Sequence, residues 1–345
     1  MSPHDDGLDL VQDMLEEQLQ RTAIRDPGIL DLPPEILLES LKYLDVQNRA
    51  KIRLISRFFE GLFWTPTMWH IFDPHGNRRV TKEDDSSVLR TFTHKLLQEC
   101  GASIKTFRYS GLHTDSLAYL STCRNLSELA LRRINGDVLV SAMKQLSLGG
   151  AFIKLRRLDI TMEDYRATTL SSESVGSLLA FIGTSCVNLQ ELHFMTNSPI
   201  NQHGLLSLLA GCHNLEALSL SSCHMLHDDN LIAITKSPCA ATLKYLCVSQ
   251  YQNASDSGLA LLGEGCPNLK VFLIHYGLSI TNSGIRALAE ACQNIEWIKI
   301  IGCRNVTLGV LDEQGFENHM DCPIVYHPEW PVGLGFAYKK MNRVL

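Results

Sequence analysis

The chain has 345 residues, of which 45% are hydrophobic and 20% charged, and its formal net charge is −6. This composition is ordinary for a globular protein, and the length suffices for two domains or for one solenoid with a small module. The acidic balance argues against a general nucleic-acid binder, which needs a basic face, and no apolar run reaches the roughly 18 residues of a membrane span.

The first six residues, MSPHDD, lack the basic start and apolar stretch of a signal peptide. We therefore expect a cytoplasmic or nuclear protein whose 11 cysteines are reduced thiols. Residues 1–30 are acidic, then polar, and are expected to form a flexible tail. A short amphipathic helix is the alternative, because four aliphatic residues have helical spacing: Leu8, Val11, Leu15 and Leu19.

Residues 31–72 form a compact apolar block that predicts three short helices and a short final strand. Asp31 is a suitable helix cap, and Pro33 and Pro34 suit the first turn that follows it. Three short helices make a core too small to be stable alone, so this block should pack on another surface. Residues 73–99 are expected to be a linker, with a polar loop followed by a helix over 88–99.

Residues 100–305 contain a short repeat, with an apolar anchor at the start of each copy. The spacing of the anchors varies, and the longest interval, from Leu155 to Leu189, holds a polar insertion around residues 163–174. A repeat this short cannot bury its own apolar face, so copies must stack. Eight anchors indicate about eight repeats: Ile104, Leu126, Leu155, Leu189, Leu215, Leu243, Leu269 and Ile295.

Each repeat reads Leu-x-x-Leu-x-Leu, then a loop, then a segment of helical periodicity such as residues 204–210 or 284–290. The first part alternates apolar and polar residues, which predicts a strand. Strand plus helix at this period is the leucine-rich repeat plan. The expected fold is therefore α/β, with a small helical module followed by a curved solenoid that has parallel strands inside and helices outside.

A cysteine precedes the anchor in seven repeats, and Phe152 takes its place in the repeat of Leu155. Equivalent positions of a solenoid form a single row, which cannot supply a four-ligand metal cage. We expect these thiols to be small buried residues that fill a turn, and we expect no metal and no cofactor. The row is Cys100, Cys123, Cys186, Cys212, Cys239, Cys266 and Cys292.

Residues 32–69 resemble an F-box, whose pattern is Leu-Pro-x-Glu-Ile-Leu, a Leu-Asp turn, a Val-Ser-Arg-like segment and a Leu-Trp pair. One departure is Arg49, where the family commonly has leucine, and this residue either weakens the adaptor contact or extends its charged end to water. Ile55 replaces the usual valine. The matching residues are Leu32, Pro33, Glu35, Ile36, Leu44, Ser56, Arg57 and Trp69.

The repeats resemble the cysteine-containing leucine-rich repeats of F-box proteins, with strand ends such as LSLSSC and IKIIGC. The two resemblances imply the substrate-recognition subunit of an SCF-type ubiquitin ligase, which binds the Skp adaptor, through it the cullin scaffold, and a protein substrate. The alternative is a scaffold that holds partners without cullin-dependent ubiquitination. The adaptor contact is expected at Leu32, Pro33, Glu35, Ile36, Leu44 and Ile55.

Residues that flank the strand leucines are expected on the concave face, which changes along its length from charged to apolar. We expect substrate to bind an aromatic cluster of Tyr245, Leu273 and Trp297, with Arg132 and Arg157 recognising acidic or phosphorylated groups. The alternative is that residues 306–345, which are rich in aromatic residues and proline, form a C-terminal cap or tail that covers this cluster.

An enzymatic role is disfavoured by the sequence. It contains no glycine-rich phosphate loop, no metal-ligand spacing and no nucleophile elbow. In the family that the chain resembles, the transfer chemistry lies in other subunits. We therefore expect no catalytic residues.

Overall fold

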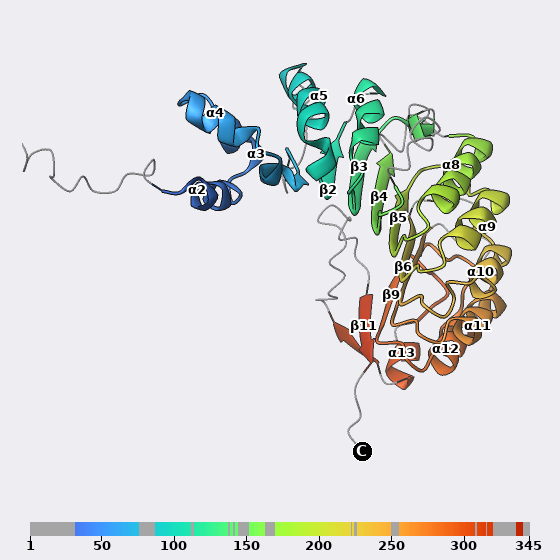
Figure 1. The fold of residues 1–345 in the computed structure, drawn as a ribbon. Coiled ribbons are helices and arrows are strands. Elements are labelled where there is room, and N and C mark those ends of the chain that lie inside the picture. Colours follow the sequence, from blue (N-terminus) through green and yellow to red (C-terminus); the bar gives the residue numbers. More distant parts are fainter. Residues whose placement is uncertain are drawn as a thin grey trace, which may run out of the picture. The chain divides into compact units, whose positions relative to one another are not determined.

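The structure is a computed structural model, and it describes residues 32–75, 87–111, 114–136, 139–140, 142–143, 152–162, 170–221, 223, 226–249, 255–307, 309–314, 316–319 and 336–340. The expectations for residues 1–30, for a cap at Asp31 and for most of the polar insertion lie outside these residues. The chain forms two compact units, Met1–Phe63 and Trp64–Leu345 (Figure 1).

The first unit holds three short helices: α2 (Pro34–Leu41), α3 (Val46–Ile52) and α4 (Arg57–Phe63). Helix α2 begins at a proline because the first helical N–H has no partner inside the helix to lose. The small core of this unit consists of residues from all three helices. Beside it, the Arg53 guanidinium lies 5.5 Å from the centre of the Phe63 ring. The buried core residues are Leu37, Leu41, Val46, Phe59, Leu62 and Phe63.

The second unit begins with aromatic residues that were predicted to end the helical block. They lie in the 3-10 helix η2 (Pro66–Trp69) and in β1 (Ile71–Phe72), which pairs with β2. Trp69 and Phe72 are fully buried, and the Phe72 ring stacks on Phe107 at 5.3 Å. The boundary between the compact units therefore lies after Phe63, inside the block predicted over 31–72.

One sheet runs through the second unit in the order β1 to β9, then β11 and β10. Strands β1 to β9 are parallel, whereas β11 pairs antiparallel with both β9 and β10. The strands after β1 are β2 (Thr106–Ser110), β3 (Glu128–Ile134), β4 (Arg157–Met162), β5 (Glu191–Met195), β6 (Ala217–Ser221), β7 (Tyr245–Ser249), β8 (Val271–His275), β9 (Trp297–Ile301), β10 (Phe316–His319) and β11 (Phe336–Lys340).

Helices cover the outer side of this parallel sheet (Figure 1). Most follow a strand and return the chain to the start of the next one. They are α5 (Ser87–Cys100), η4 (Gly101–Ser103), α6 (Thr114–Ala118), η5 (Tyr119–Thr122), α8 (Ser172–Ser185), α9 (Gln202–Gly211), α10 (Asp228–Thr235), α11 (Asp256–Gly265), α12 (Asn282–Ala291) and α13 (Gly309–Glu313). Within the described segments, no helix has the length and apolar character of a membrane span.

The predicted anchors position the strands. Each of the eight anchors is at most 1% exposed, and the strand of each repeat starts two residues after it. Burial of one residue per repeat sets the phase of the alternating residues that follow, so the same face of every strand meets the helices. The α/β solenoid with parallel strands inside and helices outside is confirmed.

Successive repeats are also joined by asparagine side chains, which the repeat motif contains in the form Cys-x-Asn-Leu. The Asn188 amide donates to the Ile153 carbonyl at 2.7 Å, and Asn268 donates to Ala241 at 2.7 Å. Each bond satisfies a turn carbonyl of the preceding repeat, which a leucine or alanine at that position would leave without a partner. Asn125 and Asn294 make the same bond, and Asn305, which follows β9, donates in a similar way to the Leu278 carbonyl after β8.

Candidate functional site

The turn between α2 and α3 is held by two charged side chains. Asp45 caps α3 by accepting a hydrogen bond from the Asn48 backbone N–H at 2.7 Å. Arg49 donates to the carbonyls of Leu44 at 2.7 Å and Lys42 at 2.5 Å, which follow the end of α2. Arg49 therefore satisfies carbonyls that the end of a helix leaves open, and its charge is directed inward rather than to water.

Burial lowers the pKa of Arg49 from its usual value, while the neighbouring Asp45 opposes this effect. The guanidinium stays charged at neutral pH because its ordinary pKa is so high. The departure from the family pattern at this position thus has a structural function within the helical unit.

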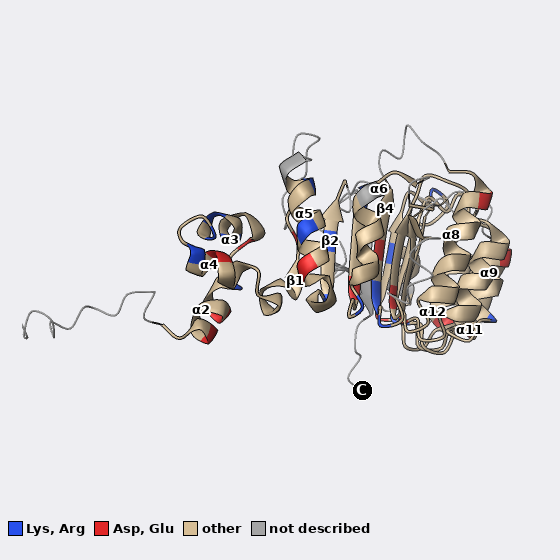
Figure 2. Cartoon of the chain, turned by 45° about the horizontal axis from the view of Figure 1, so that its top comes forward, with Lys and Arg blue, Asp and Glu red and all other residues tan. Residues whose placement is uncertain are grey.

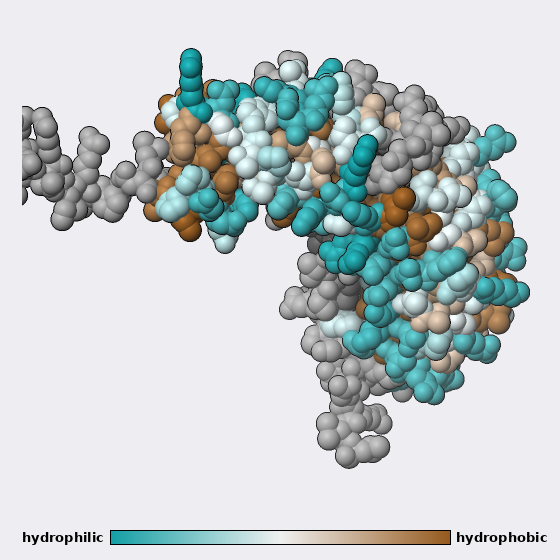
Figure 3. All heavy atoms as spheres, viewed as in Figure 1, coloured by the Kyte–Doolittle hydropathy of each residue, from teal (hydrophilic) through white to brown (hydrophobic). Residues whose placement is uncertain are grey.

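Apolar side chains lie exposed on α2 and α4 and in the segments beside them. Ile36 is 50% exposed and Ile55 is 69% exposed, although isoleucine is among the most frequently buried residues. Leu32, Leu54 and Phe58 are also exposed. Figure 3 shows apolar residues gathered over this unit. Such a concentration on so small a unit is typical of a surface that binds a partner.

The predicted adaptor residues share this exposure with one difference. Leu32, Pro33, Glu35, Ile36 and Ile55 are exposed, whereas Leu44 is half-buried in the turn. Leu54 and Phe58 were not predicted as adaptor contacts, because neither belongs to the F-box pattern. Their positions in a predicted apolar block suggested core residues instead.

The parallel register places equivalent residues of successive repeats in rows across the concave face. One row contains Glu128, Arg157, Glu191, Ala217, Tyr245, Val271 and Trp297. The next row contains Arg108, Ala130, Asp159, His193, Ser219, Cys247, Leu273 and Lys299. Both rows change from charged to apolar residues, as the sequence predicted, with small residues between them and with Lys299 as a charged residue at the end of the second row.

The charged part of the face, over β2 to β5, is a ladder of ion pairs (Figure 2). Arg108 lies 2.7 Å from Glu128, and Arg157 lies 2.9 Å from Glu191. Burial lowers the pKa of Arg108, but the hydrogen bonds and charges of Glu128 and Asp73 together raise it above its usual value. Burial raises the pKa of Glu191, although Arg157 opposes it.

Arg132 belongs to the same ladder and lies 3.3 Å from Asp159. Both predicted basic recognition residues, Arg132 and Arg157, therefore already have carboxylate partners within the chain. An acidic ligand would have to compete with these carboxylates, so the arrangement does not present two free cations to a phosphate. These pairs could not be predicted from the sequence, because the two partners of each pair belong to different repeats and are far apart in the chain.

The three predicted aromatic and aliphatic anchors are not an open surface. Trp297 and Tyr245 are each 7% exposed, and Leu273 is 1% exposed. Tyr245, Cys247 and Leu273 form one buried cluster, against which Val271 and Ala217 pack. The structure thus brings Tyr245 and Leu273 together as expected, but as core residues.

Several comparisons with known proteins bear on this arrangement. The F-box domain model matches residues 29–70. F-box/LRR-repeat protein 4 of Bos taurus is 37% identical over 71 residues, which are 21% of this chain and 11% of that protein. This chain therefore aligns with about a tenth of the length of that relative.

The chain carries an F-box domain followed by leucine-rich repeats.

Two solved structures are similar in part. A crystal structure of the Rad7 and Elc1 complex in yeast covers 90% of this chain and 96% of its own, at 16% identity and a TM-score of 0.39. A structure of a TLR13–ssRNA13 complex covers 59% of this chain and 26% of its own, at 16% identity and a TM-score of 0.35.

The cysteine row of the repeats is buried, as expected from its position before each anchor. The Cys292 thiol lies 3.3 Å from the Leu269 carbonyl oxygen, and Cys212 lies 3.5 Å from that of Cys186, so each thiol faces the preceding repeat. Burial raises the pKa of Cys212 and of Cys266 to about 12. These thiols stay protonated and are poor nucleophiles at neutral pH.

Among the described residues, no three side chains of His, Cys, Asp or Glu are placed to hold a metal ion. One titratable group on the late concave face is His275, whose pKa is lowered to about 4 by burial and by the charge of Lys299. His275 is therefore neutral at physiological pH.

Proposed function

We propose that this F-box/LRR protein is the substrate-recognition subunit of an SCF-type ubiquitin ligase. In this proposal the F-box binds the Skp adaptor, the adaptor joins the cullin scaffold, and the repeats hold a protein substrate. The observation that carries the proposal is the set of exposed apolar side chains on α2, on α4 and in the turn between α3 and α4, within the segment that matches the F-box domain.

The adaptor contact is assigned to Leu32, Pro33, Glu35, Ile36 and Ile55, with Leu44 supporting the turn beside them. Ile36 and Ile55 are its apolar centre. Burying each isoleucine side chain in an interface removes a large apolar area from water, which stabilises the complex by about 1.5–3 kcal/mol per side chain.

The test is a pull-down of purified Skp adaptor by the full chain and by the variant Ile36→Ala with Ile55→Ala. The double variant should weaken adaptor binding by at least about a hundredfold, because two central apolar contacts are lost. A matched control is Ile153→Ala, which removes an isoleucine that is 55% exposed in the repeat unit. Unchanged adaptor binding by the double variant would contradict the assignment.

A second measurement separates the ligase from a scaffold that acts without ubiquitination. Wild-type chain with adaptor should co-purify the cullin subunit, and the Ile36→Ala, Ile55→Ala variant should lose both proteins together. Retention of the adaptor without any cullin would favour the scaffold.

We further propose that substrate contacts the charged half of the concave face rather than the buried cluster of Tyr245 and Leu273. The Arg157 side chain is 55% exposed even while paired with Glu191. Because the ladder is close to charge-balanced, it suits a partner with both acidic and basic groups.

A charge exchange tests this surface. Arg157→Glu with Glu191→Arg keeps an ion pair and hence the stability, but reverses the local charge pattern. Proteins captured by the wild type but lost by the exchanged variant, at unchanged adaptor binding, would support this surface. Identical capture by both chains would place substrate elsewhere.

A further inference from the structure

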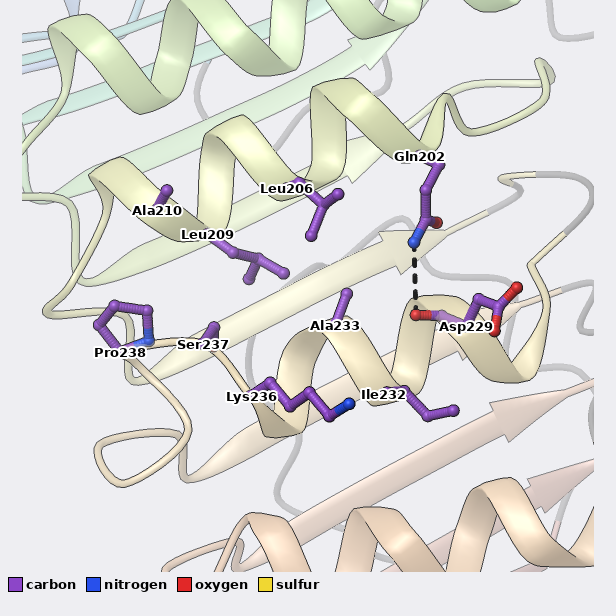
Figure 4. Close-up of a pocket in the computed structure, with 10 residues that line it drawn as sticks. All are labelled: Gln202, Leu206, Leu209, Ala210, Asp229, Ile232, Ala233, Lys236, Ser237 and Pro238. Atoms are coloured by element: carbon purple, nitrogen blue, oxygen red, sulfur yellow. Dashed lines mark hydrogen bonds between the residues drawn. The ribbon is translucent and has the colours of Figure 1, made fainter.

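The outer face of the repeats carries an apolar groove between α9 and α10, with a volume of about 380 Å³ (Figure 4). Leu206 and Leu209 form the α9 wall, and Ile232 and Ala233 form the α10 wall. Leu206 is 46% exposed. The volume lies in the range of sites that hold ligand groups, so the groove has room for apolar side chains.

The groove exists because α9 packs closely on one neighbour and not on the other. Glycines let two helices approach until their backbones touch, and both close-contact glycines of α9 face α8. Gly204 meets the backbone of Gly176, and Gly211 meets that of Gly183. Between α9 and α10, by contrast, the side chains of Leu206 and Ile232 separate the two helices, and the groove lies between these helices.

The two ends of the groove carry opposite charges. Asp229 lies in the first turn of α10. The Gln202 side chain of α9 donates to the backbone carbonyl of Asp229 at 3.5 Å and so joins the two helices. Lys236 follows the last turn of α10 at the other end. Neither charge has an ion-pair partner among the described residues. At the rise of a helix, the two positions lie about 10 Å apart.

We propose that this groove binds a short amphipathic helix of a partner protein, running antiparallel to α10. Two aliphatic side chains, one turn apart, enter between Leu206 and Ile232. The first turn of the partner helix carries an acidic residue that faces Lys236, and its last turn carries a basic residue that faces Asp229.

The direction follows from electrostatics. A helix is stabilised by negative charge near its N-terminus and positive charge near its C-terminus. When the partner runs antiparallel to α10, these favoured charges meet Lys236 and Asp229. The reverse orientation would place like charges together at both ends. Apolar residues spaced by three or four positions are the usual anchors when a helix binds a groove.

The probe is a fluorescein-labelled peptide of about four helical turns. It has Glu in the first turn, two leucines one turn apart, and Lys in the last turn, and a staple on its outer side keeps it helical and reduces the entropy lost on binding. A second peptide of the same composition exchanges the Glu and Lys positions. Binding to the full chain is measured by fluorescence anisotropy.

We expect saturable binding of the first peptide, and weaker binding of the exchanged peptide by about tenfold or more. Leu206→Asp should weaken the first peptide by about tenfold or more. Leu261→Asp is the matched control, because Leu261 is 42% exposed on α11 outside the groove, and it should leave the affinity unchanged. The double variant Asp229→Lys, Lys236→Asp should prefer the exchanged peptide, which tests the site without altering its apolar wall.

Three results would overturn the proposal: no saturable binding, equal affinity for both peptides in every variant, or equal loss from Leu206→Asp and Leu261→Asp. Sedimentation of the chain without peptide tests a different occupant. Self-association that Leu206→Asp abolishes would assign the groove to a second copy of this chain and would also overturn the proposal. Adaptor binding through the F-box is measured separately and does not depend on any of these outcomes.

Discussion

Replacing Trp297 by alanine distinguishes a core residue from a binding anchor on the late concave face. Trp297 is 7% exposed and lies at the start of β9, which pairs with β8 on one side and with β11 on the other. Truncation of a tryptophan buried to this extent leaves a cavity that its surroundings fill only in part. We therefore expect the free energy of unfolding to fall by about 3–5 kcal/mol.

A second substitution measures the neighbouring cluster. Leu273→Ala should cost about 2–5 kcal/mol, because Leu273 is almost fully buried against Tyr245 and Cys247. A double-mutant cycle of Leu273→Ala with Tyr245→Ala should show a coupling of about 0.5–3 kcal/mol, since the two side chains share contacts.

Urea unfolding followed by circular dichroism provides the free energies, and the slope with urea shows whether each variant still unfolds cooperatively. The matched control is Leu278→Ala, which removes a leucine that is 44% exposed between β8 and α12 and should cost less than about 1 kcal/mol. If Trp297→Ala were as mild as Leu278→Ala, the assignment of Trp297 to the core would be wrong and the open aromatic surface predicted from the sequence would be restored.

Other substitutions test single features. Arg49→Leu should destabilise the helical unit by about 1–3 kcal/mol, because two carbonyls near the end of α2 lose their donor. Thermal melting measures this loss, and an unchanged melting temperature would show that Arg49 does not stabilise the end of α2. Cys212→Ser should cost less than about 2 kcal/mol, because the hydroxyl retains the Cys186 carbonyl as acceptor, and a larger loss would point to packing alone. The raised pKa of Cys212 means that stability is full below pH 9 and falls as pH rises toward 12, and native thiols should react with Ellman's reagent at pH 8 far more slowly than unfolded ones. The lowered pKa of His275 gives the opposite dependence, with stability present above pH 6.5 and lost as pH falls toward 4; His275→Gln should flatten this fall in the melting temperature, and an equally steep fall would exclude His275 as its source.

The repeat architecture was determined by the sequence itself. One fully buried position per copy, such as Leu215 or Leu269, recurs with a period too long for a single helix or strand and too short for a domain. Stacking is the only way to bury such a row, so strand positions, helix positions and the parallel order follow from spacing alone. The cysteine row was predictable for the same reason.

The F-box region could also be predicted from the sequence. A run of matches from Leu32 to Trp69 carries the resemblance, and the excess of apolar residues in a small helical block indicates a partner. What the pattern did not show is the boundary between the compact units, which lies after Phe63, or the use of Arg49 inside the turn. Both depend on which residues meet in space.

The concave face shows what only the tertiary structure decided. The sequence ordered its residues correctly from charged to apolar, because strand alternation determines which side chains share a face. It did not determine whether a residue on that face is exposed or already has a partner. Arg157 meets Glu191 of the next repeat, and Leu273 is buried against Tyr245, because neighbouring strands bring distant residues within contact distance. Local periodicity determines direction, whereas exposure and pairing depend on the other repeats that surround each side chain.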